Sequence, residues 1–536
     1  MTNLLWTLVA LFASVAAPPP PPPPPPPAPP SRPKLVVVIT VDQLRPDYFT
    51  RWKGQLTGGL AQLANEGAFF TEGYQDHAVT ETAPGHSTIL SGMWPAHTGI
   101  IRNSQGVQDT LAPLIGIAGP GASPRRFRGT TLVDWLKAVD PTSRALSVSR
   151  KDRGAILPIG RAKEQVYWYQ APLFTTSKYY ADTLPTWAQA FNARRLPFQA
   201  ANTTWTLLLP DSAYKEPDNE VWENGGSDVI FPHRLPTDSL RAAAALAGVP
   251  AMDSLTLLFA LEGFEALKLG RKGGSTDILA VSLSTTDAVG HAFGPDSREI
   301  HDQVLRLDHY LGWFLKRITD KVGHDNVVVV LTADHGVTSY PERTHARTGA
   351  PTYRVLLDTL VAAVNHDLDQ IAGASRQWFD FDTGMLFLQD NGRFAAMGIR
   401  TDSILDVLTT RIMRVPGVAR VIKTADLARA DTASDPVARR WLHLITPDAG
   451  VVLTVTLQSG SIWAAPNTPP IAMHGQPSED DAHVPIIFWG RGVRRGTYAG
   501  RTNTVDIAPT LAALLGVSPL SLVDGHARTE ALLPRN

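Results

Sequence analysis

Three apolar, mostly β-branched runs, each followed by an aspartate, constrain the fold more than any other feature of this sequence. The runs cover residues 34–41, 277–284 and 326–332, and they lead to Asp42, Asp287 and Asp334. Runs without polar alternation are typical of strands buried on both faces of a sheet. Helical patterns between the runs indicate βαβ units, so we predict a mostly parallel sheet that gathers the three strand ends at one edge.

The sequence predicts further elements around this sheet. Helices are expected at 60–66, 131–139, 254–268, 299–322, 402–414 and 505–515, and strands at 144–148, 450–457 and 484–489. Two stretches interrupt the alternation, at about 160–230 and 337–470. The first is rich in aromatic residues, including Tyr167-Trp168-Tyr169, and has little periodicity. We interpret both as insertions into one catalytic domain, 34–536, and aromatic clusters of this kind are more often packing than a substrate platform.

Composition excludes several classes of function. With 49 basic and 50 acidic side chains, the net charge of −1 argues against a nucleic-acid or anionic-membrane surface spread over the whole protein. The 536 residues contain no cysteine. Disulfides, thiolate metal sites and cysteine nucleophiles are therefore excluded, and any metal must be bound by carboxylates and imidazoles.

The N-terminal residues have the features of an export signal. An apolar run covers residues 4–17, and Ser14 and Ala16 stand at −3 and −1 of a possible cleavage site. We predict a signal peptide at 1–17 and a periplasmic or secreted protein, with a retained anchor as the alternative. Residues 18–33 are mostly proline, which predicts a stiff solvated linker before a domain that begins near Lys34.

A second candidate functional segment is TETAPGHSTILSGMWPAHTGIIRN, residues 80–103. Pro84 and Gly85 can open a helix, which predicts that Thr82 lies just before the positive end of that helix. A hydroxyl at this place is either a nucleophile or an ordinary N-cap, and the segment alone leaves both readings open.

Histidines accompany the aspartates at the predicted strand ends. Asp42, Asp287, His291, Asp334, His335 and one later histidine supply oxygen and nitrogen ligands that suit zinc. Taken singly, each is an ordinary cap or a satisfied polar residue. Six ligands exceed one tetrahedral site but suffice for two ions, and a pair about 4 Å apart stabilises both the attacking and the leaving oxygen in phosphoryl transfer. Residues 150–153, Arg-Lys-Asp-Arg, read on their own as a solvated charged turn.

Seven motifs in a fixed order carry a resemblance to a known family. They are VDQLRPD from Val41, TAPGHSTILSG from Thr82, GIIRN ending at Asn103, SRKDRGAI from Ser149, TTDAVGH from Thr285, TADHG from Thr332 and HG at His474. At these residues the chain resembles the alkaline phosphatase superfamily, in particular secreted bacterial phosphatases with a threonine nucleophile. The resemblance implies an α/β fold, a three-layer α/β/α sandwich around the mostly parallel sheet with inserted cap segments.

The resemblance also implies roles for individual residues. One zinc ion would be held by Asp287, His291 and His474, and the other by Asp42, Asp334 and His335, with Thr82 bridging as nucleophile. Asn103, Lys151 and Arg153 resemble the groups that bind phosphoryl oxygens. His483, in DAHVP, is an alternative to His474 as the last ligand. We prefer His474 because the related phosphodiesterases also present this ligand in an HG pair.

The implied activity is hydrolysis of phosphate monoesters through a phosphothreonine intermediate at a two-zinc site. A monoester dianion carries more nonbridging charge than a diester, so it gains more from Lys151 and Arg153. The alternative is a phosphodiesterase or nucleotide pyrophosphatase, whose pattern lacks the Lys-x-Arg pair. A non-catalytic metal-binding protein would be expected to lack a ligand. We expect a monomer acting on small phosphate monoesters, with no nucleic-acid partner and no membrane contact beyond export.

Overall fold

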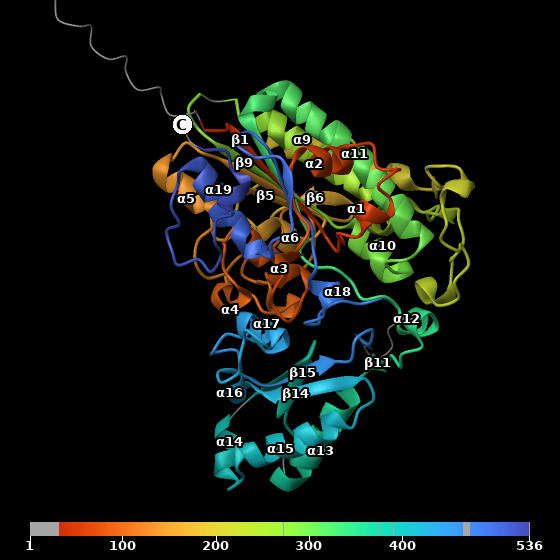
Figure 1. Ribbon diagram of the computed structural model, residues 1–536, viewed down its shortest axis with the longest axis vertical. Helices are drawn as coiled ribbons and strands as arrows, with labels where there is room; N and C mark the ends of the chain where they lie inside the picture. The colour runs from red at the N-terminus through yellow and green to blue at the C-terminus, as the bar shows by residue number, and fades with distance from the viewer. Residues whose placement is uncertain (1–31, 272, 374, 390, 465–471, 535–536) are drawn as a thin grey trace, which may run out of the picture. The chain divides into compact units, whose positions relative to one another are not determined.

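A nine-stranded sheet organises the chain. The computed structural model describes residues 32–271, 273–373, 375–389, 391–464 and 472–534, and residues 32–533 form one compact unit. The strand order is β18-β2-β17-β10-β1-β9-β4-β5-β6. Figure 1 shows β1, β9, β5 and β6 of this sheet among the helices. The strands are β1 Leu35–Val41, β2 Ala68–Phe70, β4 Ala145–Ser149, β5 Gln165–Gln170, β6 Leu173–Thr175, β9 Asp277–Leu283, β10 Val327–Thr332, β17 Ile486–Gly490 and β18 Gly496–Tyr498.

The middle of this sheet is parallel, as the alternation of strands and helices predicts. β1 lies between β10 and β9, with Val36 opposite Val328 on one side and Ile278 on the other. β4 continues the parallel set beside β9, and β5 follows beside β4. β17 runs antiparallel to both β10 and β2, and β6 is antiparallel to β5. The carboxyl ends of β1, β9 and β10 therefore meet at one edge.

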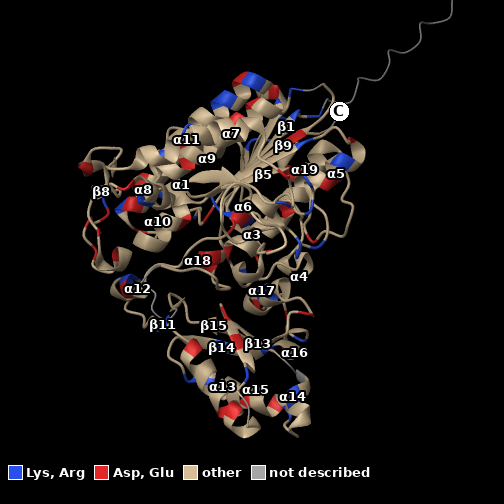
Figure 2. Ribbon diagram, turned by 180° about the vertical axis from the view of Figure 1, so that it is seen from behind, with Lys and Arg blue, Asp and Glu red and all other residues tan. Residues whose placement is uncertain are grey.

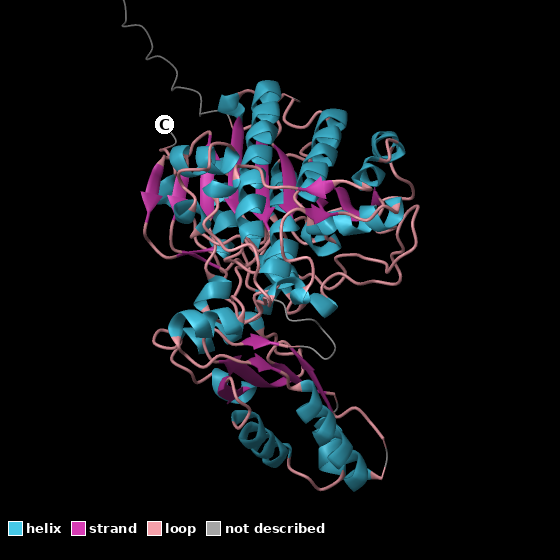
Figure 3. Cartoon of the chain, turned by 90° about the vertical axis from the view of Figure 1, so that its right-hand side faces the viewer, coloured by secondary structure: helices cyan, strands magenta, loops and turns pink. Residues whose placement is uncertain are grey.

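Helices cover both faces of the sheet, which gives the three layers. Every residue of β1 is buried, and alternate residues enter different cores. Leu35, Val37 and Ile39 face one core, whereas Val36 and Val38 face the other. The first core contains α2 (Gly59–Glu66), α9 (Ala251–Leu267) and α11 (Arg298–Val322), and the second contains α3 (Thr82–Ile89), α5 (Leu132–Val139), α6 (Asp152–Ile156) and α19 (Ile507–Leu515). Figure 3 shows the strands of the sheet side by side, with helices packed against them. Figure 2 shows basic and acidic residues interspersed on the helices.

The predicted insertion at 337–470 contains a second sheet with a core of its own. Its four antiparallel strands have the order β12-β13-β15-β14, and they are β12 Phe379–Asp382, β13 Met385–Leu388, β14 Val418–Lys423 and β15 Val451–Leu457. Helices α13 (Asp358–Ala372) and α15 (Thr401–Met413) pack on it. From α17 (Pro436–Leu444), Trp441 and Leu444 share a cluster with Val79 and Ile101, which flank α3 in the sequence.

The start of the first predicted insertion is wrong. Residues 165–175, which fall in the 160–230 range, form β5 and β6 and extend the main sheet. Tyr167 faces one core and Trp168 the other, each 2% exposed. The aromatic run hides the strand pattern because both of its faces are buried, so no polar alternation remains.

Shorter elements complete the chain. They are α1 Tyr48–Arg51, β3 Gly73–Tyr74, α4 Pro95–Thr98, α7 Thr186–Ala193, β7 Thr204–Trp205, β8 His233–Arg234, α8 Ser239–Ala245, α10 Thr285–Phe293, α12 Pro341–Thr348, β11 Arg354–Val355, α14 Asn391–Ala396, α16 Thr424–Leu427, β16 Ile462–Trp463, α18 Glu479–Ala482 and β19 Thr502–Asn503. The predicted signal peptide and nearly all of the predicted linker lie outside the described residues. Within those residues, no single helix is long and apolar enough to cross a membrane. One bent pair of helices, 239–248 with 251–267, has the length and composition of a membrane span, and nothing beyond length and composition points to one.

Candidate active site

Three neighbouring strands deliver the predicted acidic residues to one place. Asp42 follows β1 directly, and its backbone N–H donates to Leu283 O at the end of β9 (2.9 Å). Asp287 lies in the first turn of α10, which begins after β9, and Asp334 comes two residues after β10. All three are at most 4% exposed. Parallel pairing of the strands brings these carboxylates together, as the sequence predicts.

The first predicted set of ligands forms a tight triangle of donor atoms. His291 lies one turn after Asp287 on α10, and its Nε2 is 3.2 Å from Asp287 Oδ1. His474 Nε2 is 3.5 Å from the same oxygen and 3.1 Å from His291 Nε2. The Nδ1 atoms of both histidines contact backbone carbonyls, Ala472 O at 2.6 Å and Thr80 O at 2.7 Å. These contacts point both Nε2 atoms at the carboxylate.

The second predicted set lies beside the first. His335 Nε2 is 3.3 Å from Asp42 Oδ1 and 3.7 Å from Asp334 Oδ2. The His335 ring stacks on His474, with ring centroids 3.7 Å apart. Both carboxyl oxygens of Asp42, Oδ2 of Asp334 and Nε2 of His335 are buried without a hydrogen bond from the described residues.

The donor sets fit two divalent cations. Two tetrahedral ligands that are each about 2.0–2.1 Å from a zinc ion lie roughly 3.4 Å apart, and the donor distances above fall between 3.1 and 3.7 Å. All donors are carboxylate oxygens or imidazole nitrogens, which zinc accepts. Both oxygens of Asp42 are buried without a hydrogen bond and are balanced only by the nearby Lys151 (2.6 Å) and His335 (3.3 Å), so a bound cation would complete their coordination.

The protonation states also suit metal binding. Burial and the charge of Asp287 act to raise the pKa of Asp42, but Lys151 and His335 outweigh them and hold it well below its usual value. Burial likewise acts to raise the pKa of Asp287, but Lys151 and His291 outweigh burial and hold this pKa well below its usual value. Burial lowers the pKa of His474 to about 3. These groups are therefore ionised carboxylates and a neutral imidazole at neutral pH, the forms that bind metals.

His335 differs from His474 because carboxylates surround it. Burial alone would lower the pKa of His335, but the charges of Asp334 and Asp42 raise it to about 9. A cation bound at this set would replace the proton, since metal binding at such ligands releases protons.

Thr82 is the first residue of α3 and is 1% exposed. The sequence placed it just before the helix, but the helix begins two residues earlier than Pro84 and its N-cap position is Glu81. Thr82 is therefore not the cap, and its hydroxyl lies at the positive end of the helix dipole, which stabilises a developing negative charge. Lys151 Nζ donates to Thr82 Oγ1 at 3.0 Å.

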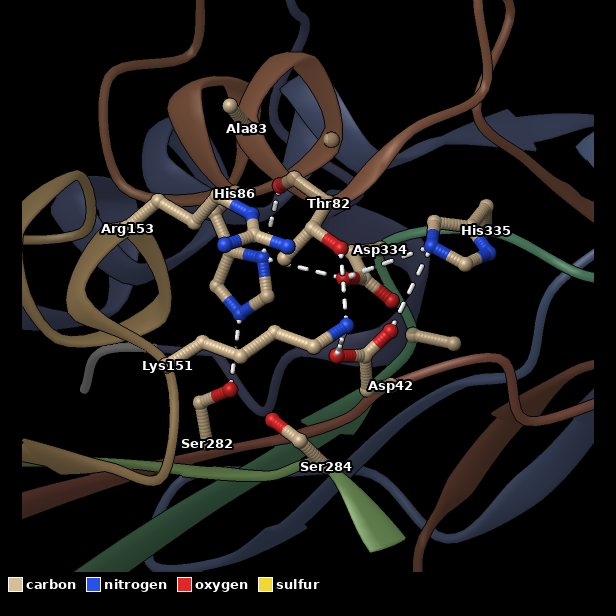
Figure 4. A network of polar contacts seen from close by, with 12 residues as sticks. Asp42, Thr82, Ala83, His86, Lys151, Arg153, Ser282, Ser284, Asp334 and His335 are labelled. Carbon is tan, nitrogen blue, oxygen red and sulfur yellow. Dashed lines mark hydrogen bonds and ion pairs between the residues drawn. The ribbon is translucent and has the colours of Figure 1, made fainter. Parts of the chain in front are cut away.

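Lys151 contacts Thr82, the candidate nucleophile, and one carboxylate of each donor set. Its Nζ is 2.6 Å from Asp42 Oδ2 and 2.7 Å from Asp287 Oδ2. Figure 4 shows Lys151 and Arg153 extending toward Thr82 from the start of α6. Apart from a 3.5 Å contact to Asp152, no ion pair within the described residues uses the Arg153 guanidinium. Residues 150–153 are thus not the solvated turn that their composition alone suggests.

Asn103 is held at the beginning of α3. Its Oδ1 accepts from Ala83 N (2.9 Å), and its backbone N–H donates to Glu81 Oε2 (2.8 Å). The inserted sheet reaches this point as well, because Thr383, in the turn between β12 and β13, donates to Glu81 Oε1 (3.1 Å). In the described part of the chain no hydrogen bond uses the Asn103 amide nitrogen, so Asn103 can donate to a substrate oxygen beside Thr82.

His483 lies elsewhere. Its Nε2 contacts Thr71 O at 2.8 Å, and its ring stacks on Tyr74, with ring centroids 4.9 Å apart. The structure therefore brings His474, and not His483, to the donor cluster.

Two residues at the site were missed by the sequence analysis, although both lie in motifs that it singled out. Gln43 is 1% exposed, with φ at 66°, and donates from its backbone N–H to Asp334 (3.2 Å) and from Nε2 to Asp287 (3.1 Å). His86, on α3, contacts Thr82 O (2.9 Å) and Asp334 Oδ2 (3.1 Å) through Nδ1. The sequence did hold a signal for both residues, because Gln43 directly follows Asp42 and His86 lies one helical turn after Thr82. Neither glutamine nor histidine identifies a role by its residue type alone.

Comparison with known proteins agrees with this geometry. Residues 36–362 match the family described as type I phosphodiesterase / nucleotide pyrophosphatase. Alkaline phosphatase PhoK of Sphingomonas sp is 34% identical over 532 residues, covering 92% of this chain and 90% of that protein. Alkaline phosphatase PhoV of Synechococcus elongatus is 33% identical over 531 residues, covering 94% and 93%.

Solved structures show the same relation. The crystal structure of wild-type alkaline phosphatase PafA matches with a TM-score of 0.85 at 29% identity, covering 94% of this chain and 99% of that one. Murine ectonucleotide pyrophosphatase / phosphodiesterase 5 matches with a TM-score of 0.54 at 13% identity, which shows a shared fold. The chain belongs to the type I phosphodiesterase / nucleotide pyrophosphatase family, within the alkaline phosphatase superfamily.

Proposed function

We propose that the protein is an alkaline phosphatase, a two-zinc phosphomonoesterase in which Thr82 is the nucleophile. The observation that carries this proposal is the Thr82 hydroxyl at the start of α3, 3.0 Å from a lysine that also contacts a carboxylate of each donor set. The relatives PhoK, PhoV and PafA, all named alkaline phosphatases, support it. One PafA variant of known structure carries substitutions at a threonine, an asparagine, a lysine and an arginine, the same residue types in the same order as Thr82, Asn103, Lys151 and Arg153.

The proposed metal sites follow the two donor sets. Asp287, His291 and His474 would hold one zinc ion, and Asp42, Asp334, His335 and Thr82 the other. Bound zinc would supply a positive field that favours the Thr82 alkoxide and the departing oxygen of the ester.

The reaction then proceeds in two displacements. Thr82 Oγ forms a bond to phosphorus while the ester P–O bond breaks, the alcohol departs with a proton and Thr82 becomes phosphothreonine. Water next attacks phosphorus, the Thr82–phosphorus bond breaks, and inorganic phosphate leaves. Asn103, Lys151 and Arg153 donate hydrogen bonds to the nonbridging oxygens, where negative charge is concentrated in both steps.

A monoester preference is tested by removing the cations that recognise the extra nonbridging charge. A hydrogen bond to an ion contributes roughly 1.5–3 kcal/mol, and each 1.36 kcal/mol is tenfold in rate. The double variant of Lys151→Ala and Arg153→Ala should therefore lose roughly two to four orders of magnitude in kcat/KM for an aryl phosphate monoester. It should lose much less for the matched aryl diester.

Two measurements make this test decisive. Zinc content is determined on the same samples. Lys137→Ala serves as the control, because Lys137 Nζ is paired with Glu164 Oε1 (2.5 Å) and contacts neither donor set. Equal losses on both substrates with full zinc content would favour the second candidate, a phosphodiesterase, which the description of the matching family supports.

We further propose a periplasmic or secreted protein in which the catalytic domain, 34–536, follows a cleaved signal and a proline linker. The support is the sequence of residues 4–33. Mass spectrometry of the exported protein should find a new N-terminus near Ala17, and an intact Met1 on soluble exported protein would refute the cleavage.

A further inference from the structure

A cavity of about 340 Å³ lies where the insertion meets the rest of the catalytic domain, and arginine dominates its lining. Three segments, 99–105, 125–128 and 446–449, form its walls together with one residue that follows α6. Four of the ten lining residues are arginines, which give the arginine cavity its name: Arg125, Arg126, Arg128 and Arg161. None of the four belongs to the proposed reaction.

Carboxylates of the protein neutralise two of these arginines. Arg128 holds Asp448 of the insertion with two nitrogens, Nη2 at 2.5 Å and Nη1 at 3.3 Å. Arg125 Nη1 is 3.5 Å from Asp109 Oδ1. Gly99, with φ at 76°, leaves room for this wall of the cavity, because a Cβ there would lie 3.0 Å from Arg128 Nε.

The other two arginines have only carbonyl partners. Arg126 Nη1 donates to Gln108 O (2.6 Å), and Arg161 Nη2 donates to Arg125 O (2.8 Å). In the part of the chain that the structure describes, no ion pair includes either guanidinium. Each guanidinium has several further N–H donors, which remain for solvent or a ligand. The arginine cavity thus carries two positive charges that the protein leaves unbalanced.

We propose that the arginine cavity binds a phosphate group at a site separate from the two donor sets. A phosphate dianion matches the two unbalanced charges, and guanidinium groups bind its oxygens through paired N–H donors. A carboxylate would neutralise only one of these charges. The volume is at the lower end of the range for small-molecule sites, roughly 300–1,000 Å³, which suits a small anion.

The arginine cavity lies beside the segment that carries Asn103. Its lining residue Gln105 ends the 3₁₀ helix 103–105, which begins at Asn103. Gln108 also connects the two places, since its O accepts from Arg126 (2.6 Å) and its Nε2 donates to Asn103 O (3.2 Å). Under the proposed function, a phosphate group here has two sources. One is inorganic phosphate, the reaction product, and the other is the distal group of a substrate that carries two phosphates.

Equilibrium dialysis of the zinc-loaded protein against radioactive inorganic phosphate, at physiological ionic strength, tests the binding. The wild type should bind one phosphate per chain more than the double variant of Arg126→Gln and Arg161→Gln. Each single variant should weaken this additional binding at least tenfold. The control is Arg241→Gln, at an exposed position of α8 without an ion pair in the described residues, and it should bind like the wild type.

Two outcomes would overturn the proposal. One is equal phosphate binding by the wild type and the double variant. The other is additional binding that appears only at low salt, where non-specific attraction between charges is weakly screened. Phosphate bound at the donor sets counts equally in both proteins, so the comparison holds whether or not the protein hydrolyses esters. Arg161 is exposed, so Arg161→Gln alone provides the test if the double variant is unstable, and Tm and zinc content are measured on every sample.

Kinetics with matched substrates identify the source of the phosphate. The measured quantity is the ratio of kcat/KM for an α,ω-alkanediol bisphosphate to kcat/KM for the monophosphate of the same chain length. A distal phosphate in the arginine cavity should raise this ratio at least tenfold in the wild type and in Arg241→Gln. The double variant should return the ratio to the statistical value for a substrate with two equivalent groups. A ratio that is the same in the wild type and the double variant would assign the bound phosphate to free inorganic phosphate.

Discussion

Gln43 allows a direct test of how the two donor sets are held together. It contacts a carboxylate of each set, Asp334 through its backbone and Asp287 through its side chain. Gln43→Ala removes only the second contact, a hydrogen bond to an ionised group worth roughly 1.5–3 kcal/mol. That energy corresponds to one or two orders of magnitude, and groups that orient metal ligands typically contribute 10–100-fold in affinity. We therefore expect zinc binding at the Asp287 set to weaken by roughly 10–100-fold.

Gly290 offers an independent way to displace the same side chain. A Cβ at Gly290 would lie 1.8 Å from Gln43 Oε1, so Gly290→Ala must push the glutamine away. Alanine otherwise favours a helix over glycine by about 1 kcal/mol. Gly290→Ala should therefore weaken zinc binding like Gln43→Ala. In the double variant, the alanine at 43 leaves room for the new methyl group, and the effect should equal that of Gln43→Ala alone.

Zinc affinity is measured by competition with a chromogenic chelator, and stoichiometry by elemental analysis. Gln55→Ala is the control for a lost glutamine, since Gln55 bonds to Ala213 O and His301. Gly312→Ala is the control for a helical glycine, because a Cβ at Gly312 would lie 3.3 Å from its nearest neighbours, Gly58 Cα and Gly59 N, and would not touch Gln43. Additive losses in the double variant, or unchanged affinity in Gln43→Ala, would refute the reasoning.

Three further predictions concern metal and stability. His474→Ala should lose zinc and His483→Ala should retain it, which elemental analysis of both proteins decides; loss only in the second would move the ligand to His483. Chelation should abolish phosphatase activity, zinc should restore it, and full turnover by metal-free protein would contradict the two-zinc proposal. Asp76, bound by three arginines, has its pKa lowered to about 2, because these groups outweigh the effect of burial. The stabilisation from this lowered pKa is present above about pH 4 and is lost as the pH falls toward 2. Asp76→Asn should therefore lower the free energy of unfolding at pH 7 by roughly 2 kcal/mol, with a smaller difference below pH 3 in denaturant titrations.

The sequence predicted the fold best where a buried strand ends next to a polar residue. The β-branched runs predicted β1, β9 and β10 to within a residue at each end, and parallel pairing then placed Asp42, Asp287 and Asp334 together. The direction of β17 could not be predicted, because a buried strand reads the same whether its neighbours are parallel or antiparallel. β5 was missed for a related reason, since its aromatic residues are buried on both faces.

The sequence predicted the metal ligands of the candidate site better than it predicted the residues around them. The resemblance supplied Asn103, Lys151 and Arg153, which no local pattern identifies. Gln43 and His86 are defined by contacts to Asp287 and Asp334, hundreds of residues away, and such contacts exist only after folding. The start of α3 also depends on tertiary context, because Pro84 is tolerated in the first turn and does not itself mark the first residue.

The order in which β17 joins the sheet has a consequence for biogenesis. This strand, residues 486–490, fits between β10 and β2, and His474 lies 12 residues before its first residue. A nascent chain that lacks these last residues has neither a closed sheet nor the third donor of the Asp287 set. Synthesis proceeds from the N-terminus, so the donor cluster becomes complete only when nearly the whole polypeptide has emerged. Binding of the proposed zinc ion at the Asp287 set would thereby be deferred until nearly the whole chain has been made, and in an exported protein it would take place in the compartment where the chain folds.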